Sequence, residues 1–164
     1  MTQTFLISDT HFWHTNIIAY EQRPFSSIEE MNSALIKSWN RVVKKDDLVI
    51  HLGDFSLANR EKTAHIFSQL RGTKWLVLGN HDRQRSISWW MNIGFKKVFE
   101  FPIIYKDFYI LSHAPVYMNA QMPYLNLHGH IHSKTYKESF YKNVSVECID
   151  YTPIEFGVAT KREE

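Results

Sequence analysis

Residues 4–11 read TFLISDTH, and this stretch sets the pattern for the first half of the chain. Thr4–Ser8 is a short apolar run that ends in polar residues, which is typical of a buried strand. The same pattern recurs in LVIHLGD (residues 48–54) and in WLVLGNHD (residues 75–82). Each of these predicted strands ends at residues that carry a carboxylate, an amide or an imidazole. Because ligands in open α/β sheets collect outside the carboxyl ends of strands, we expect these side chains to converge at one edge.

Helical patterns separate the three predicted strands. Ser27–Glu30 is the signature of a capping box, and Ile28–Val42 behind it carries apolar residues at steps of three and four. A second helix is expected in Ala58–Leu70, with Gly72 as its stop, and a third in Gln84–Met91. The N-terminal half of the chain therefore alternates strand and helix.

The C-terminal half follows a different pattern, because short strands follow one another with little helix between them. The expected strands are Lys97–Phe101, Tyr105–Ser112, Leu125–His128 and Val144–Ile149. The two halves together predict an α/β fold, a four-layer αββα sandwich of two packed mixed β-sheets flanked by helices. Since 164 residues fit one domain, we expect a single domain over residues 1–164.

The composition excludes several classes of protein. A hydrophobic share of 44% and a charged share of 22% are those of an ordinary globular chain, not a disordered one. The net charge of +2 is too small to indicate a dedicated nucleic-acid surface, which needs a clustered basic stripe. The single cysteine cannot form an intramolecular disulfide, and no stretch resembles a signal peptide or a membrane helix. We therefore expect a cytoplasmic protein without a membrane partner, and the sequence leaves the oligomeric state open.

Metal-binding side chains gather at the predicted strand ends. Residues two apart in extended backbone point the same way, so we expect Asp9 and His11 to aim at one point, and likewise His130 and His132. The donors are oxygen and imidazole groups without a thiolate, which suits divalent Mn, Fe, Zn, Ni or Mg rather than a structural zinc. The set is too large for one ion, so two ions share it if Asp54 bridges them. The candidate ligands are Asp9, His11, Asp54, Asn80, His113, His130 and His132.

The order of these blocks resembles that of a known family. The series D-x-H, G-D, G-N-H-D, H and G-H-x-H, which runs from Asp9 to His132, is similar to that of the calcineurin-like metallophosphoesterase superfamily. The longer strings SDTHFWHTNII, QRPFSSIEEMN, HLGDF, LGNHDR and LHGHIH resemble a branch of small, single-domain bacterial and phage phosphoesterases. The matching blocks span about three quarters of the chain. The resemblance implies the metallophosphoesterase fold.

The resemblance also implies two divalent metal ions, with Mn as the first choice and Fe, Ni, Zn or Mg as alternatives. Their ligands would form two groups that share Asp54 as a bridge. The first group would be Asp9, His11 and His132, and the second would be Asn80, His113 and His130.

The resemblance further implies catalytic roles for two residues. His81 would protonate the leaving oxygen or stabilise charge, and Asp82 would orient its ring. A hydroxide that bridges two cations is available near neutral pH and would attack phosphorus in line with the leaving group. We therefore expect metal-dependent hydrolysis of phosphate esters, in the first place phosphodiesters of small nucleotide-like substrates.

Other functions remain open at this point. Within the enzymes, the alternatives are a phosphomonoesterase and a nuclease. A nuclease is less favoured, because it would need a basic, salt-sensitive surface. Outside the enzymes, the alternative is a metal-binding protein scaffold of the same fold, although no ligand of the series is missing here.

Several polar residues near the blocks have two interpretations. Arg23 offers a fork of donors to a phosphate, or it fixes a surface loop. His14 and Asn16 either cap the helix expected at Ile17 or reach into the site. We keep Arg23, Asn16 and His14 as candidate substrate-binding residues. His128 either supports the ligands from behind or packs in the core.

Overall fold

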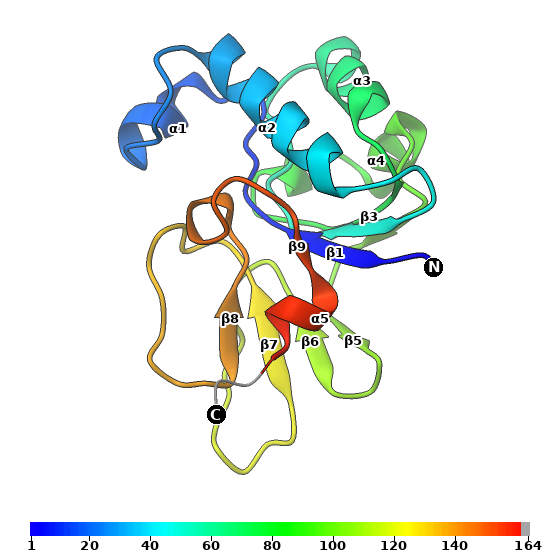
Figure 1. Cartoon of the computed structure of the whole chain (residues 1–164). Coiled ribbons are helices and arrows are strands. Elements are labelled where there is room, and N and C mark those ends of the chain that lie inside the picture. Colours follow the sequence, from blue (N-terminus) through cyan, green and yellow to red (C-terminus); the bar gives the residue numbers. More distant parts are fainter. Residues whose placement is uncertain (162–164) are drawn as a thin grey trace.

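The apolar runs of the N-terminal half form the centre of one sheet. In the computed structural model, which describes residues 1–161, β1 (Thr4–Ile7) pairs in parallel with β2 (Leu48–His51), and β2 pairs in parallel with β3 (Thr73–Val77). The parallel strand β4 (Lys97–Phe99) and the antiparallel strand β9 (Ile154–Glu155) complete the sheet. Its strand order is β4-β3-β2-β1-β9 (Figure 1).

The second sheet comes from the C-terminal half. It contains β5 (Ile103–Tyr105), β6 (Tyr109–Leu111), β7 (Leu125–His128) and β8 (Tyr141–Asn143), in the order β5-β6-β7-β8. The β5–β6 pair is antiparallel, and the other two pairs are parallel. The predicted α/β fold with two packed mixed sheets is therefore confirmed.

Two of the expected strands are wrong in their bounds. Tyr105–Ser112 is not one strand, because Lys106 and Asp107 adopt φ angles of 47° and 65° and turn the chain between β5 and β6. Val144–Ile149 is not a strand either, since Val146–Cys148 forms the 3-10 helix η2. A short apolar run can be buried as a strand or as a helical turn, so its composition alone does not identify its backbone conformation.

Three helices cover the outer face of the first sheet (Figure 1). These are α2 (Ile28–Val42), α3 (Arg60–Gln69) and α4 (Ile87–Ile93). The remaining helices are short: α1 (Thr15–Tyr20), the 3-10 helix η1 (Asp82–Gln84) and α5 (Phe156–Ala159). The helical layers are thus unequal, because the four-residue α5 is the one α-helix that follows α4 within residues 1–161.

Helix α2 begins where the capping box predicts. The Ser27 side chain accepts a hydrogen bond from the Glu30 N–H at 3.1 Å. The Glu30 carboxylate, however, accepts from the N–H of Ser26 at 2.7 Å, one residue earlier than the usual partner. The face that carries Ile28, Met31, Leu35 and Trp39 is buried against the first sheet.

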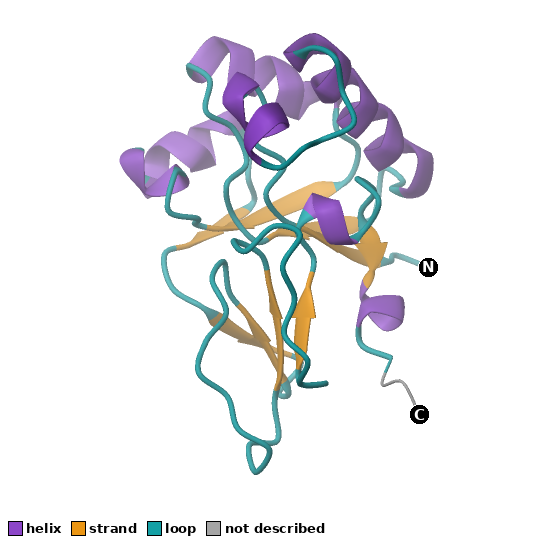
Figure 2. Ribbon diagram, turned by 90° about the vertical axis from the view of Figure 1, so that its left-hand side faces the viewer, coloured by secondary structure: helices purple, strands orange, loops and turns teal. Residues whose placement is uncertain are grey.

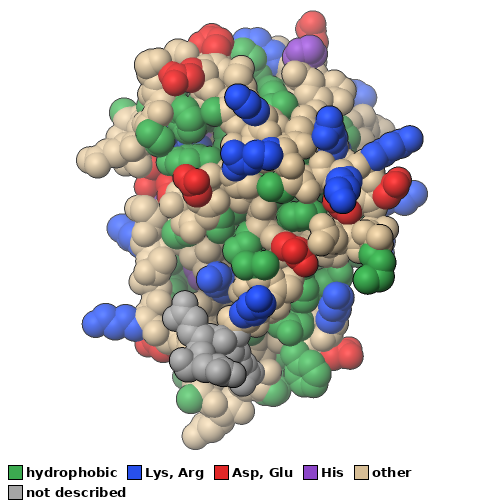
Figure 3. Space-filling view, in the orientation of Figure 1, with side chains coloured by type: hydrophobic (Ala, Val, Ile, Leu, Met, Phe, Trp, Pro, Cys, Tyr) green, Lys and Arg blue, Asp and Glu red, His purple; other side chains and the backbone are tan. Residues whose placement is uncertain are grey.

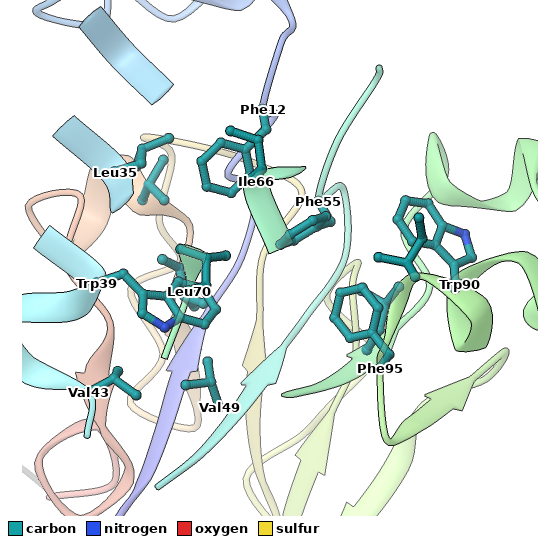
Figure 4. Packing of buried hydrophobic residues seen from close by; sticks show 14 of the residues in the cluster. Phe12, Leu35, Trp39, Val43, Val49, Phe55, Ile66, Leu70, Trp90 and Phe95 are labelled. Carbon is teal, nitrogen blue, oxygen red and sulfur yellow. The ribbon is translucent and has the colours of Figure 1, made fainter. Parts of the chain in front are cut away.

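The core lies in two layers. Large side chains such as Trp39, Phe55 and Trp90 fill the space between the helices and the first sheet (Figure 4). A second cluster, which includes Leu6, Ile50, Leu52, Leu111 and Leu127, fills the space between the two sheets. The central strands of the first sheet therefore have core packing on both of their faces. The loops that follow these strands converge at one edge of the sheet, on the side of the molecule that faces the viewer in Figure 2.

Candidate metal centre

All seven candidate ligands lie at the edge where the loops converge. Asp9 and His11 follow β1, Asp54 follows β2, and Asn80 follows β3, as the sequence predicts. The second sheet contributes His113 after β6, and His130 and His132 after β7. The site is therefore assembled from both sheets.

The backbone of the site differs from the extended geometry that we expected. Five of the seven candidate ligands have positive φ angles: Asp9 (59°), His11 (50°), Asp54 (56°), His130 (70°) and His132 (52°). A non-glycine residue in this region costs about 1–3 kcal/mol, and such residues cluster at functional sites. Cross-strand hydrogen bonds hold two of these turns, from Asp9 N–H to the Gly53 carbonyl (2.9 Å) and from His11 N–H to the Asp54 carbonyl (3.0 Å).

The first group of ligands surrounds one oxygen of Asp9. The Oδ1 atom of Asp9 lies 3.5 Å from His11 Nε2 and 3.8 Å from His132 Nε2. Both Asp9 Oδ1 and His11 Nε2 are buried and have no hydrogen-bond partner in the described part of the chain. The other carboxylate oxygen, Oδ2, accepts from Ser8 Oγ (2.7 Å), His130 N–H (2.8 Å) and Ser145 Oγ (3.2 Å). One oxygen is thus fixed, and the other faces the imidazoles.

The second group surrounds Asn80. Its Oδ1 atom lies 2.9 Å from His113 Nε2 and 3.1 Å from His130 Nδ1, and the two ring nitrogens are 3.2 Å apart. Asp54 belongs to both groups, because its Oδ2 lies 3.4 Å from His113 Nε2 and 3.5 Å from His11 Nε2.

This donor set fits divalent cations. In two groups of candidate ligands, Asp9–His11–His132 and Asp54–His113–His130, the ligand atoms lie within 4.8 Å of one another. The same spacing holds for His11–Asp54–His81, which adds the His81 ring, and for Glu21–His132–Glu147 at the rim of the site. Burial alone would raise the pKa of Asp9 and Asp54, yet hydrogen bonds and charges from His11 and His113 hold the pKa of both carboxyls well below the usual range. Burial alone would lower the pKa of His113, but the Asp54 carboxylate raises it to about 9. The buried carboxylates therefore attract positive charge, and the orphaned Asp9 Oδ1 and His11 Nε2 are suitable ligand atoms.

Each of three imidazoles is oriented by a partner at its Nδ1 atom. The partners are His14 Nδ1 for His11 (3.0 Å), the Leu52 carbonyl for His113 (2.7 Å) and Glu147 Oε1 for His132 (3.0 Å). Such contacts fix the ring and leave the opposite nitrogen, Nε2, for a metal. In His130 the arrangement is reversed, because its Nδ1 faces the second group.

Two glycines permit the close approach of the loops. A Cβ atom at Gly129 would overlap Ser8 Oγ and Asp9 Oδ2, and one at Gly79 would overlap Asp54 Oδ1. These glycines let the turns after β7 and β3 pass directly over the carboxylates.

The structure corrects the phosphate-binding role expected for Arg23. Its side chain is fully buried, and its donors are occupied by the protein. Nη1 donates to the Thr10 carbonyl (3.0 Å), Nη2 donates to the Asp9 carbonyl (2.7 Å), and Nε and Nη2 both donate to Glu147 Oε1 (2.9 and 2.7 Å). A guanidinium bound in this way has no free fork for a phosphate. Arg23 instead fixes the backbone that carries Asp9.

His14 and Asn16 have different surroundings. His14 precedes α1, but its side chain makes no capping hydrogen bond. Its ring stacks on His11 with centroids 5.2 Å apart, so the contact with the site replaces the expected cap. Asn16 is exposed on α1, and the hydrogen bonds of residues 1–161 give its side chain no partner in the site.

The position of Asp82 also corrects an expectation. Its carboxylate is fully buried and accepts backbone N–H bonds from Asp54 (2.7 Å), Gly79 (2.8 Å) and Phe55 (3.1 Å). Both oxygens are thereby occupied, so Asp82 joins the turns after β2 and β3 and does not orient the His81 ring. It does not cap α4 either, because Ser86 does so.

Sequence reasoning missed Glu147, which contacts both Arg23 and His132 through Oε1. The available signal was weak, namely one acidic residue within the apolar stretch 144–149. Ser8 and Ser145, which bind Asp9 Oδ2, were also missed, because nothing local distinguishes them from other serines.

A pocket of ≈ 360 Å³ opens beside the second group. Asn80, His113 and His130 form one side, and apolar residues such as Val77 and Val116 form much of the rest. Arg83 also lines this pocket, and its side chain is exposed.

Comparisons with known proteins place these observations in a family. The family model described as calcineurin-like phosphoesterase matches residues 3–157. A protein of Methanocaldococcus jannaschii, described as uncharacterized protein MJ1445, is 37% identical over 172 aligned residues, which cover 98% of this chain and 91% of that protein. The gene 66 protein of Mycobacterium phage L5 is 36% identical over 85 residues, or 50% of this chain and 41% of that protein.

A solved structure supports the same grouping. The crystal structure of AQ665 from Aquifex aeolicus, a protein of unknown function, superposes with a TM-score of 0.72 at 27% identity, and the match covers 94% of this chain and 96% of that one. Within residues 1–161, no helix has the length and apolar character needed to cross a membrane.

Proposed function

Because the chain belongs to the calcineurin-like phosphoesterase family, we propose that it hydrolyses phosphodiesters of small nucleotide-like molecules with two divalent metal ions. Metal-dependent hydrolysis of phosphoesters is the activity of the family. The observation that supports the two-metal part of this proposal is the position of Asp54 Oδ2, which lies 3.5 Å from His11 Nε2 and 3.4 Å from His113 Nε2. A carboxylate oxygen shared by two groups of ligands is what a dinuclear centre requires.

The seven candidate ligands would hold the two metal ions in two groups. Bound cations would neutralise phosphate charge and lower the pKa of a water molecule, which makes a nucleophile available near neutral pH. Mn is our first choice, with Fe, Ni, Zn and Mg as alternatives. Asp54 would be shared, Asp9, His11 and His132 would form the first group, and Asn80, His113 and His130 would form the second.

His81 is suited to deliver the proton that the leaving oxygen needs. Its backbone N–H donates to Asp54 Oδ1 at 3.0 Å, and its ring centroid lies 5.4 Å from that of His11. The residue is half-buried, and the hydrogen bonds of residues 1–161 leave its ring nitrogens free for a substrate. A ring N–H in this position can protonate the oxygen as the ester bond breaks.

The pocket beside the second group supports a substrate with an organic group of limited size. Its volume of ≈ 360 Å³ lies within the range of small-molecule sites, and its apolar walls suit a ring. Arg83 also lines the pocket, but its guanidinium contacts the carboxylate and the backbone carbonyl of Glu100, so we assign it no role in binding the substrate. On the face shown in Figure 3, Lys and Arg side chains are interspersed with acidic and apolar ones rather than gathered in one stripe, which gives no support to a nuclease on that face.

The test compares bis-p-nitrophenyl phosphate with p-nitrophenyl phosphate, using protein stripped of metal and reloaded with Mn²⁺. We expect diester turnover that requires Mn²⁺ and is lost in Asp54→Asn. The matched control is Asp46→Asn, an exposed aspartate outside the site, which should behave as the unaltered protein. Turnover of the monoester alone would replace the proposal with a phosphatase, and turnover that survives in Asp54→Asn would contradict the shared ligand.

A further inference from the structure

A second pocket, of ≈ 420 Å³, lies behind the loop that carries His130 and His132. Its walls include His128 at the end of β7, residues of β8, Cys148 of η2, and Thr152 and Pro153 with Ile154, the first residue of β9. In Figure 1, β8 and the chain that leads into β9 lie at the front. None of the seven candidate ligands lines this pocket, so it is distinct from the metal centre. Its volume falls in the ~300–1,000 Å³ range of small-ligand sites.

One residue that lines the pocket, His128, carries an unpartnered polar atom. His128 is fully buried, and its Nδ1 donates to the Gly129 carbonyl at 2.9 Å. In the neutral ring Nε2 is then an acceptor, and it has no hydrogen-bond partner among the described residues. A buried acceptor without a partner is unfavourable by about 1–3 kcal/mol. An N–H or O–H group of an occupant that reaches this buried atom would satisfy it.

The remaining walls favour a planar, negatively charged occupant. The rings of Tyr136 and Tyr141 lie 4.8 Å apart and 6.3 and 5.9 Å from the His128 ring. Tyr141 donates its hydroxyl to the Val116 carbonyl, whereas Tyr136 is half exposed and can stack on a ligand. Lys142 also lines the pocket, and the ion pairs of residues 1–161 include none for it.

We propose that this pocket binds a small heteroaromatic anion with a ring N–H or amino donor, a purine nucleotide being the simplest example. The donor would bond to His128 Nε2, the ring would stack on Tyr136, and Lys142 would attract the anionic group. This site is separate from the substrate site proposed above, because none of the candidate metal ligands lines it.

Occupancy of the pocket is coupled to the metal centre through the loop between them. Three wall residues donate to carbonyls of that loop: His128 to Gly129 (2.9 Å), Asn143 to His132 (2.7 Å) and Cys148 to His132 (3.2 Å). A ligand that shifts these donors shifts the backbone of His132. If the ligand thereby changes the affinity for the metal by some factor, thermodynamic linkage requires that the metal change the affinity for the ligand by the same factor.

Cys148 offers a direct measure of occupancy, because it is the single cysteine of the chain and lines the pocket. The rate of its alkylation by iodoacetamide is followed by mass spectrometry on metal-free protein in EDTA, so that no metal can hold the phosphate of the probe. AMP and GMP should slow alkylation in a saturable manner, by about fivefold at a concentration four times Kd. Adenosine, which lacks the charge, should protect less.

Two variants at solvent-accessible positions test whether the protection of Cys148 results from binding in this pocket. Tyr136→Ala should abolish protection by AMP, and Lys142→Gln should reduce protection by AMP to that given by adenosine. The control is Phe108→Ala, an exposed aromatic residue in the turn between β5 and β6, which should be protected as the unaltered protein is. Absence of protection by both AMP and GMP, or equal protection in Tyr136→Ala, would overturn the proposed site.

The coupling is tested by the affinity for Mn²⁺, measured as free Mn²⁺ by electron paramagnetic resonance. Carboxamidomethylation of Cys148 fills part of the pocket and removes the donor to His132. We expect it to weaken Mn²⁺ binding by about fivefold or more. Cys148→Ser, which keeps a donor, should bind Mn²⁺ as the unaltered protein does. Equal Mn²⁺ affinity of alkylated and unaltered protein would overturn the coupling.

Discussion

At the scale of single residues, the candidate centre depends on which nitrogen each imidazole presents. His14, the Leu52 carbonyl and Glu147 occupy the Nδ1 atoms of three histidines, so that Nε2 faces the carboxylates. The ring of His81 has no such partner within residues 1–161, although its backbone is held by Asp54. A ring without such a partner is what the proposed role of His81 as a proton donor requires.

His81→Ala should lower kcat for the diester by about 10²–10⁴-fold and leave the bound Mn²⁺ unchanged. The reason is that the backbone N–H of His81, and not its ring, makes the hydrogen bond to Asp54 Oδ1. Turnover and metal content are measured on the same preparation, with His65→Ala on the exposed side of α3 as the control. A parallel loss of metal and activity would make His81 a ligand.

Arg23→Lys should weaken Mn²⁺ binding by about 10–100-fold, although the residue touches no candidate ligand through a metal-facing atom. A lysine cannot bond simultaneously to Glu147 and to the carbonyls of Asp9 and Thr10. Mn²⁺ titration well below the melting temperature distinguishes this positioning effect from general loss of stability. Arg41→Lys, at an exposed site on α2, serves as the control, and an unchanged affinity in Arg23→Lys would refute the role.

At the scale of elements, β3 carries a buried lysine beneath α3. Lys74 Nζ donates to the carbonyls of Leu70 (2.6 Å) and Gly72 (2.9 Å) and lies 4.2 Å from the centre of the Phe67 ring. Burial lowers the pKa of Lys74 to about 8 from its ordinary value of 10.5. Between these two values the unfolded chain binds more protons than the folded one, so stability increases as the pH rises.

We therefore expect Lys74 to raise the free energy of unfolding by roughly 2–3 kcal/mol between pH 8 and pH 10.5. Urea denaturation at a series of pH values measures this gain. Lys74→Met retains most of the side-chain volume without the charge, so the variant should lack the gain, while other titrations affect both proteins alike. Parallel curves for the two proteins would show that Lys74 titrates normally.

At the scale of the whole molecule, the candidate centre joins the two sheets. Asp9, His11, Asp54 and Asn80 come from the first sheet, and His113, His130 and His132 come from the second. A metal that binds both sets should therefore stabilise the packing of the sheets against each other, because it binds the folded chain alone.

Mn²⁺ at about 100 times its Kd should stabilise the protein by about 2.7 kcal/mol, measured as a rise in Tm by calorimetry. Asp54→Asn should lose most of this rise, because Asp54 Oδ2 lies in both groups of ligands. Asp46→Asn should keep it. A full Mn²⁺-dependent rise in Asp54→Asn would contradict a shared carboxylate, whatever the stability of that variant without metal.

The features that depend on neighbouring residues could be predicted from the sequence. Apolar runs that end in Asp, His or Asn predicted β1, β2 and β3 and the convergence of their ends, because strand ends of a parallel sheet meet at one edge. The capping box at Ser27 predicted the start of α2. The order of the blocks from Asp9 to His132 indicated the family, and the family match confirms it.

The contacts that support the candidate ligands depend on the packed fold and could not be predicted from the sequence. Arg23 meets Glu147 across 124 positions of the chain, and Asp82 meets the N–H groups of the turn after β2, so neither role has a local signature. The left-handed φ angles of Asp9 and His11 likewise arise from bonds to the turn after β2. The physical reason is that a buried polar group must find a partner, and only the packed fold determines which partner is within reach.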